Sequence, residues 1–275
     1  MYEFQNDQAA GLRCIMGGAK PRVMSIISTS AHDNQPRLLT NLAASIRCHD
    51  VEVLVVHAAQ ESYEATSEYE MKGIHTLLDV AQQKSSLQDA LRSTSKGFAV
   101  AKLYKNQNHA AWDIKSHHRL EQIFCTLANR YEIVLVDTAL NRQNSLPLKK
   151  LNDSEIVIQL TRNPESIKQA YRLIKRICQQ LGNRPFGILV ADATETQAQI
   201  VFRNIAQVAR RYLHIELVLM GAIPSDEHLG RAAKLGRTVI DAFPMAMASN
   251  AFKTLAKRLD CKQSWPSKVG QASFV

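Results

Sequence analysis

The chain alternates between short apolar runs and longer segments whose apolar residues recur every three to four positions. Short continuous runs rich in Val, Ile and Leu are typical of buried strands, whereas the longer period is typical of helices. The predicted strands are 22–28, 51–56, 98–103, 133–136, 155–160, 187–190 and 217–223. The predicted helices are 38–46, 73–78, 87–91, 119–130, 164–181, 197–212 and 250–259.

This order of elements predicts an α/β fold of three layers. Strands that alternate with helices indicate a mostly parallel central sheet with helices on both faces. The strands are continuously apolar, as expected for strands that are buried on both faces. We expect an N-terminal peptide at 1–18, one α/β domain at 19–260 and a loosely patterned tail at 261–275, since a chain of 275 residues suits one large core.

Composition narrows the functional classes. The five cysteines are far apart and form no CxxC pair, so neither a disulfide framework nor a zinc site is predicted and a reducing cytoplasm is expected. No apolar run approaches the roughly 18–20 residues of a membrane span, and Glu3 and Asp7 argue against a signal peptide. The net charge of +9 favours acidic surfaces. We expect no specific nucleic acid as a ligand, because aromatic residues do not interleave with the basic ones.

The loop after the first predicted strand occupies the place where α/β proteins of this kind bind phosphate. A phosphate loop needs glycines to wrap the phosphates, a lysine for charge and a Ser or Thr for magnesium. Residues 29–36 contain neither glycine nor lysine, and Asp33 adds negative charge. Pro36 suits the first turn of the following helix. The sequence therefore predicts a strand–loop–helix frame without its ligand chemistry.

Other catalytic patterns are weak. Asp137 follows a buried strand and is suited either to orienting magnesium-bound water or to a structural turn; without partners, the structural interpretation is favoured. The pair His117 and His118 has no acid or nucleophile at a recognisable spacing. No GxSxG or HExxH string is present. We predict no catalytic residues and no metal ligands of the chain's own.

Two stretches carry a resemblance to a known family. Residues 153–175 (DSEIVIQLTRNPESIKQAYRLIK) resemble the MinD/ParA-type ATPases, which follow this strand with a T-x-x-P-x-S-I-x-x-A-Y turn and helix. Residues 197–224 and the following segment to 259 are similar to the flagellar-number branch of that family, FlhG or FleN. The resemblance covers about 22–260. It implies a MinD-like P-loop fold and a regulator of flagellar number or placement.

The opening of the chain carries the most specific part of this resemblance. FlhG proteins have an N-terminal D-Q-A-x-x-L-R motif, and every fixed position is met here by Asp7, Gln8, Ala9, Leu12 and Arg13. In the family this peptide binds FlhF, a signal-recognition-type GTPase, and stimulates its hydrolysis of GTP. The hypothesis for this chain is that Gln8 orients the attacking water, since GTPases use a glutamine in that way. Leu12 then anchors the peptide, and Asp7 and Arg13 fix its register.

The departures from the family lie in the phosphate loop. The family's K-G-G-x-G-K-T loop falls on residues 30–36. Ser30 replaces the signature lysine that reaches a dimer partner's phosphate. Gln35 replaces the phosphate-loop lysine, and Pro36 replaces the threonine that binds magnesium.

Further departures lie at the strand ends. The family's D-x-D falls on His57 and Ala59, and its adenine-contacting Asn falls on Ala191. Asp137, the Walker-B-type acid, is retained. The joint loss predicts a pseudo-ATPase with no nucleotide cofactor of its own, which acts as a GTPase activator rather than as an enzyme.

Two alternatives stay open. The chain is alternatively an atypical MinD/ParA-like switch that binds ATP and Mg²⁺ and controls flagellar gene expression or polar localisation. A weaker alternative is a basic DNA binder of the ParA kind. Expected partners are an FlhF-type GTPase and, beyond it, a flagellar transcription regulator or a C-ring component. The expected location is the cytoplasm, with recruitment to the cell pole or weak association with the inner membrane as further expectations.

Overall fold

A computed structural model describes residues 21–29, 35–58, 75–105, 113–141 and 143–260. Its strands are β1 (Arg22–Ser28), β2 (Val53–His57), β3 (Leu91–Ser93), β4 (Ala99–Lys102), β5 (Ile133–Asp137), β6 (Glu155–Leu160), β7 (Phe186–Ala191) and β8 (Leu217–Ile223). Its helices are α2 (Gln35–Arg47), α4 (Leu77–Ala81), α5 (Leu87–Ala90), α6 (Ile114–Ala128), the 3₁₀ helix η2 (Lys149–Asp153), α7 (Pro164–Leu181), α8 (Glu195–Leu213), α9 (Glu227–Lys234), α10 (Val239–Ala242) and α11 (Met247–Asp260).

One eight-stranded sheet organises the described residues. Its strand order is β3-β4-β2-β5-β1-β6-β7-β8, and every neighbouring pair is parallel except β3 with β4. β1 therefore lies in the interior of the sheet between β5 and β6. The carboxyl ends of the parallel strands form one edge, which is where ligands bind in open α/β sheets.

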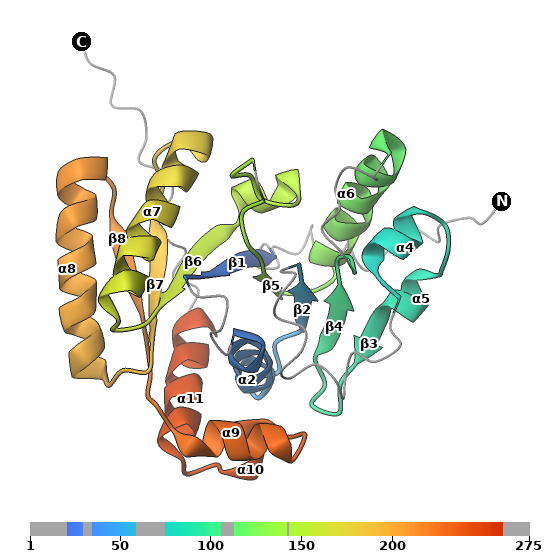
Figure 1. Cartoon of the computed structure of the whole chain (residues 1–275). Coiled ribbons are helices and arrows are strands. Elements are labelled where there is room, and N and C mark those ends of the chain that lie inside the picture. The colour runs from blue at the N-terminus through green and yellow to red at the C-terminus, as the bar shows by residue number, and fades with distance from the viewer. Residues whose placement is uncertain (1–20, 30–34, 59–74, 106–112, 142, 261–275) are drawn as a thin grey trace.

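Two apolar layers cover the two faces of the sheet (Figure 1). The layer beneath α4, α6, α7 and α8 contains Val56, Val136 and Ile158, whereas the layer beneath α2 and α9–α11 contains Val55, Leu135 and Val157. Adjacent residues thus enter opposite layers, because successive side chains of a strand point to opposite faces. This arrangement confirms the predicted three-layer α/β fold.

The bounds of several elements match the sequence predictions. The predicted strands 22–28, 155–160 and 217–223 and the predicted helix 164–181 are confirmed residue for residue. One short helix was misplaced, and the predicted helix 87–91 is confirmed as α5 but ends one residue earlier. α4 begins only at Leu77, because Thr76 adopts an extended conformation and caps the helix in a reciprocal capping box with Asp79. Leu91, predicted to end a helix, instead begins β3.

Four elements were not predicted from the sequence. β3 is three residues long and largely exposed, so it carries no apolar run. The 3₁₀ helix η2 and the helices α9 and α10 are likewise short. α9 buries Ala232 alone among its eight residues. These elements depend on tertiary contacts rather than on local periodicity.

Candidate functional site at the carboxyl edge of the sheet

Four polar positions form a row across the carboxyl edge of the sheet. His57 ends β2 and is in register with Asp137 at the end of β5, while Ser28 of β1 is in register with Gln159 of β6. Each stands two positions after a residue of the layer beneath α2, as His57 does after Val55, and residues two apart share one face of a strand. By strand periodicity, all four side chains therefore point to the α2 face. The row lies where the loop from β1 leads into α2.

His57 and Asp137 are in direct contact within this row. The imidazole Nδ1 lies 3.4 Å from Asp137 Oδ2. The side chain of His57 is 5% exposed and that of Asp137 is 0% exposed. A buried carboxyl group needs a compensating partner, and His57 supplies one here.

Unpaired oxygen atoms gather at the same edge. Seven buried side-chain atoms of the described residues have no hydrogen-bond partner, and three of them are Asp137 Oδ1, Thr138 Oγ1 and Gln159 Oε1. These three residues are 0%, 1% and 2% exposed. Buried polar atoms are normally paired, and this is the edge at which open α/β sheets bind ligands. The carboxyl edge is therefore the candidate site.

The structure describes only some of the site residues that were predicted from the sequence. His57 and Asp137 are brought together, as just described. Gln35 and Pro36 are the first two residues of α2, which confirms the prediction that Pro36 lies in the first turn of this helix. Ser30 and Ala59 lie outside the described residues, and so do the five motif positions, Asp7, Gln8, Ala9, Leu12 and Arg13. The predicted peptide 1–18 and tail 261–275 lie outside them as well.

A cavity of about 450 Å³ adjoins this edge between the ends of β1, β6 and β7 and the start of α7. Ser166 organises its wall: its hydroxyl oxygen lies 2.7 Å from Thr29 Oγ1 and accepts the Thr161 N–H at 2.8 Å. Asn163 caps α7 by accepting the Glu165 N–H at 2.9 Å. The wall is thus built by hydrogen bonds between β1 and the β6–α7 turn.

Sequence reasoning did not assign these cavity residues to a site. Arg162 crosses to the next turn and donates from Nε to the carbonyl of Asp192, whose φ of 54° is left-handed. The available signal was the T-x-x-P-x-S string, whose Thr and Ser are Thr161 and Ser166. That string indicates the family, but by itself it does not indicate a cavity.

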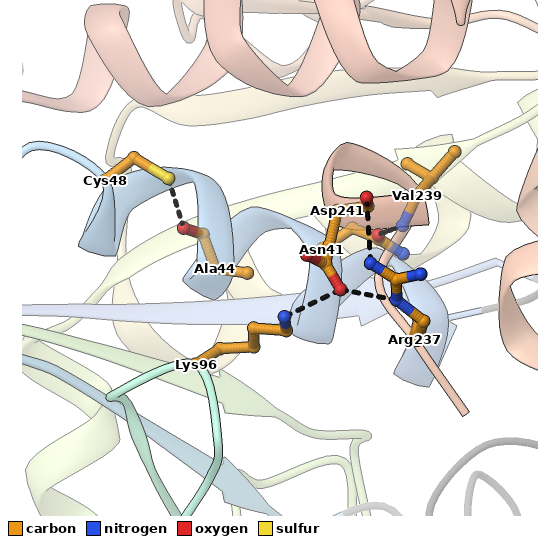
Figure 2. Close-up of polar contacts among 7 residues, drawn as sticks. All are labelled: Asn41, Ala44, Cys48, Lys96, Arg237, Val239 and Asp241. Atoms are coloured by element: carbon orange, nitrogen blue, oxygen red, sulfur yellow. Dashed lines mark hydrogen bonds and ion pairs between the residues drawn. The ribbon is translucent and has the colours of Figure 1, made fainter. Parts of the chain in front are cut away.

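A second polar cluster links α2 to α10 and α10 to the turn between β3 and β4 (Figure 2). Asn41 of α2 accepts the Val239 N–H at the start of α10 through Oδ1, at 2.6 Å. Asp241 of α10 lies 2.7 Å from Arg237 Nε and 2.6 Å from Lys96 Nζ, in the turn between β3 and β4. Hydrogen bonds from Arg237 and then Lys96 lower the pKa of Asp241 to about 2. This cluster fixes α2 relative to α10 and the β3–β4 hairpin.

Comparison with known proteins places the chain in a family. No model of a protein family matches it. Over 193 residues, it is 30% identical to the antiactivator FleN of Pseudomonas aeruginosa, across 70% of this chain and 68% of that protein. The chain belongs to the FleN family. This confirms the resemblance drawn from residues 153–259.

Solved structures agree with this assignment at the level of the fold. The cell division protein MinD of Aquifex aeolicus matches with a TM-score of 0.64 at 19% identity, over 90% of this chain and 99% of that chain. MinD of Pyrococcus horikoshii, in complex with Mg-ADP, matches with a TM-score of 0.67 at 16% identity, over 87% and 96%. The FleN-family chain therefore has the MinD/ParA P-loop fold.

Two residues at the start of α2 lack the groups with which a P-loop binds Mg-ATP. Gln35 carries no charge, and Pro36 has neither a hydroxyl group nor a backbone N–H to donate. His57 contacts one carboxylate oxygen of Asp137. Among the described residues, no three His, Cys, Asp or Glu side chains gather as metal ligands. None of the described helices is long and apolar enough to cross a membrane.

Proposed function

We propose that this FleN-family chain regulates flagellar number or placement as a pseudo-ATPase that activates a partner GTPase. In this proposal the MinD-like domain is a docking platform, and the N-terminal D-Q-A-x-x-L-R peptide binds an FlhF-type GTPase and stimulates its hydrolysis of GTP. The single observation that carries it is a P-loop frame with replaced nucleotide-binding residues behind a complete activator motif. In this proposal the domain does not hydrolyse ATP, and the GTP hydrolysis that it promotes occurs in the partner.

The contact between His57 and Asp137 supports the first half of the proposal. A magnesium ion needs free carboxylate or water oxygens arranged octahedrally. Here Asp137 Oδ2 is already within 3.4 Å of an imidazole nitrogen, in a setting from which water is excluded. One oxygen of Asp137 is thus in contact with a side chain of the protein itself, and Gln35 and Pro36 carry no charge that could bind phosphate.

A titration with ATP and Mg²⁺ tests this half. We expect isothermal titration calorimetry to detect no binding at micromolar concentrations, and hydrolysis assays to show no phosphate release above background. A variant with Gln35→Lys and Pro36→Thr serves as the matched control, since it returns the two family residues to the loop. Micromolar, magnesium-dependent binding of ATP by the unchanged protein would contradict the pseudo-ATPase.

GTP turnover by the cognate FlhF-type GTPase tests the second half. We expect the full-length protein to accelerate turnover and Gln8→Ala to remove most of that effect, because the side chain that orients the water is lost. Gln5→Ala is the matched control, since Gln5 precedes the motif. Equal stimulation by Gln8→Ala and the unchanged protein would exclude a catalytic role for Gln8. No stimulation by a protein that still binds the GTPase would exclude the activator role.

A second candidate function rests on a different observation. Asp137 Oδ1 is buried and unpaired, as an oxygen awaiting a cation would be, and the similar Pyrococcus horikoshii MinD was solved with Mg-ADP. This supports an atypical ATP-binding switch that controls flagellar gene expression or polar localisation. The name of the relative, an antiactivator, favours a transcription regulator as a further partner. Recruitment from the cytoplasm to the pole or inner membrane, and docking of a C-ring component, belong to the same proposal.

A further inference from the structure

The outer surface of α8 exposes apolar side chains to which the proposed function assigns no role. Ile200, Val208 and Tyr212 are 51%, 40% and 61% exposed. Together with Asn204 they recur every four residues, so they form one row along the helix. Rows of this spacing are the ridges with which helices pack against one another. The exposed fractions show that no described element covers this apolar row.

A basic row runs beside the apolar row of α8. Arg203, Gln207 and Arg211 are exposed, and they also recur every four residues. The guanidinium carbon of Arg211 lies 5.4 Å from the centre of the Tyr212 ring, which is close enough for a cation–π contact. Among the described residues, neither Arg203 nor Arg211 has a carboxylate within the 4.0 Å limit of an ion pair. The described part of the protein therefore does not neutralise their charge.

The neighbouring helix α7 extends this positive surface (Figure 1 shows α7 in yellow and α8 in orange). The two helices pack side by side on the same face of the sheet. The exposed cations of α7 are Lys168, Arg172, Lys175 and Arg176. Like charges that are four residues apart on a helix destabilise it, and natural sequences break local rules mainly where function requires it. The spacing of these cations therefore favours a binding role for this face.

The carboxylates of the two helices do not cancel this charge. Residues 166–181 and 196–213 contain seven cations and no acidic residue. Glu165, at the start of α7, lies within 4.0 Å of two of these cations. At the other margins, Glu195 lies 3.5 Å from Arg258 of α11, and Glu216 accepts two hydrogen bonds from Arg210. These three carboxylates are thus engaged, and the face keeps an excess of positive charge.

We propose that this face of α7 and α8 binds an acidic amphipathic helix of a partner protein. The apolar stripe of that helix covers the apolar row of α8, and its carboxylates pair with Arg203, Arg211 and the cations of α7. An apolar centre inside a charged rim is the common anatomy of protein interfaces, and charge complementarity sets specificity and association rate. The proposal rests on the docking role proposed above, but not on the activation of a GTPase.

Other occupants fit this face less well. A second copy of the chain would place two positively charged faces against each other, and like charges across an interface cost binding free energy. A nucleic acid would offer phosphates to the arginines but would leave the apolar row of α8 uncovered. A helix matches both rows, because an amphipathic helix itself carries an apolar stripe beside a charged face.

The probe is a fluorescein-labelled peptide of about 20 residues, long enough to form a helix, with leucine at i, i+3, i+4 and i+7 and glutamate on the opposite face. Its binding to the full-length protein is measured by anisotropy. We expect Arg211→Glu and Ile200→Ser each to weaken binding at least about fivefold. Arg119→Glu and Ile114→Ser are the matched controls, since they make the same changes at exposed positions of α6. Hydrogen exchange should slow in α8 and not in α6 when the peptide is added.

Four results would overturn the proposal. The first is an equal loss of binding for Arg211→Glu and Arg119→Glu, which would indicate a general effect of net charge. The second is equal binding of a peptide with glutamine in place of glutamate. The third is tighter, Arg211-dependent binding of a DNA duplex or of phosphatidylglycerol vesicles than of the peptide. The fourth is a dimer of the unchanged protein, seen by analytical ultracentrifugation, that Ile200→Ser dissociates.

Two features of the design keep these outcomes interpretable. All four substituted side chains are exposed, so thermal melts by circular dichroism should match the unchanged protein. None of the readouts involves GTP turnover, so a failure of this proposal and a failure of GTPase activation can be told apart.

Discussion

Two polar clusters border α2, and they differ in how completely their atoms are paired. At the carboxyl edge, Asp137, Thr138 and Gln159 each leave a buried oxygen without a partner. At α10, Asn41 and Asp241 bond to groups on two further elements, although the neighbouring Thr238 hydroxyl is unpaired. Polar groups kept for architecture are generally satisfied by the protein itself. The difference therefore separates a cluster that holds elements together from one whose polar atoms the protein itself does not fully pair.

The largest expected effect comes from breaking the contact between His57 and Asp137. His57→Leu leaves the buried carboxyl of Asp137 without this partner, so we expect the free energy of unfolding to fall by about 3 kcal/mol. The double variant His57→Leu with Asp137→Leu removes the whole polar pair from an apolar layer. We expect it to recover most of that loss, since well-packed apolar residues are often as stable as the buried polar pair that they replace.

Urea unfolding of the unchanged protein, the single variant and the double variant measures this comparison. Recovery in the double variant means that the pair is not needed for the fold. If the double variant is as unstable as His57→Leu, the fold needs the pair. The pair is then part of the framework of the protein and is not evidence for a ligand site at the carboxyl edge.

The two clusters also differ in what the sequence could reveal about them. The frame of the site followed from local patterns, because β1, β5 and α2 carry strong apolar periodicity and Pro36 marks a helix start. The contact between His57 and Asp137 did not follow, because it depends on a register between strands that are 80 positions apart in the chain. It could have been expected only once the strand order β2-β5-β1 was known.

The second cluster was still less accessible to sequence reasoning. Asn41 and Val239 are 198 positions apart, and both α9 and α10 were missed because they are short. Asp241 has no local motif that announces two cationic partners, one of which comes from the β3–β4 hairpin. Periodicity therefore predicts layers, whereas the pairing of polar side chains depends on topology.

In the cluster of Asp241, Arg237 and Lys96 we expect a smaller change in the free energy of unfolding, and this change depends on pH. The pKa of Asp241 is lowered from 3.8 to about 2, so its contribution to stability is complete above about pH 4 and is lost as the pH falls through 2. Since the carboxylate is partly exposed, we expect Asp241→Asn to cost about 1 kcal/mol or less at pH 7. The difference from the unchanged protein should shrink towards zero near pH 2.

Urea midpoints at pH 7, 4 and 2 test this expectation, with Glu132→Gln as the control. Glu132 is exposed, and its carboxylate forms no ion pair among the described residues, so its substitution should show little change at pH 7. A cost for Asp241→Asn that stays constant from pH 7 to pH 2 would show that the side chain acts through packing rather than charge. The paired cluster would then not be electrostatic in origin.

The smallest expected effect comes from removing one threonine hydroxyl group. The same change can be made where the hydroxyl is unpaired and where it is hydrogen-bonded, so the two environments are compared directly. Thr138 Oγ1 is buried and unpaired, whereas the equally buried Thr29 Oγ1 lies 2.7 Å from Ser166 Oγ. Thr29→Val should cost about 1 kcal/mol of unfolding free energy, since it leaves Ser166 without that partner. Thr138→Val should change it by less than about 0.5 kcal/mol, because no hydrogen bond is lost and the shape is kept. Equal costs in urea unfolding would mean that Thr138 has a partner in solution, and that the carboxyl edge is as fully satisfied as the rest of the protein.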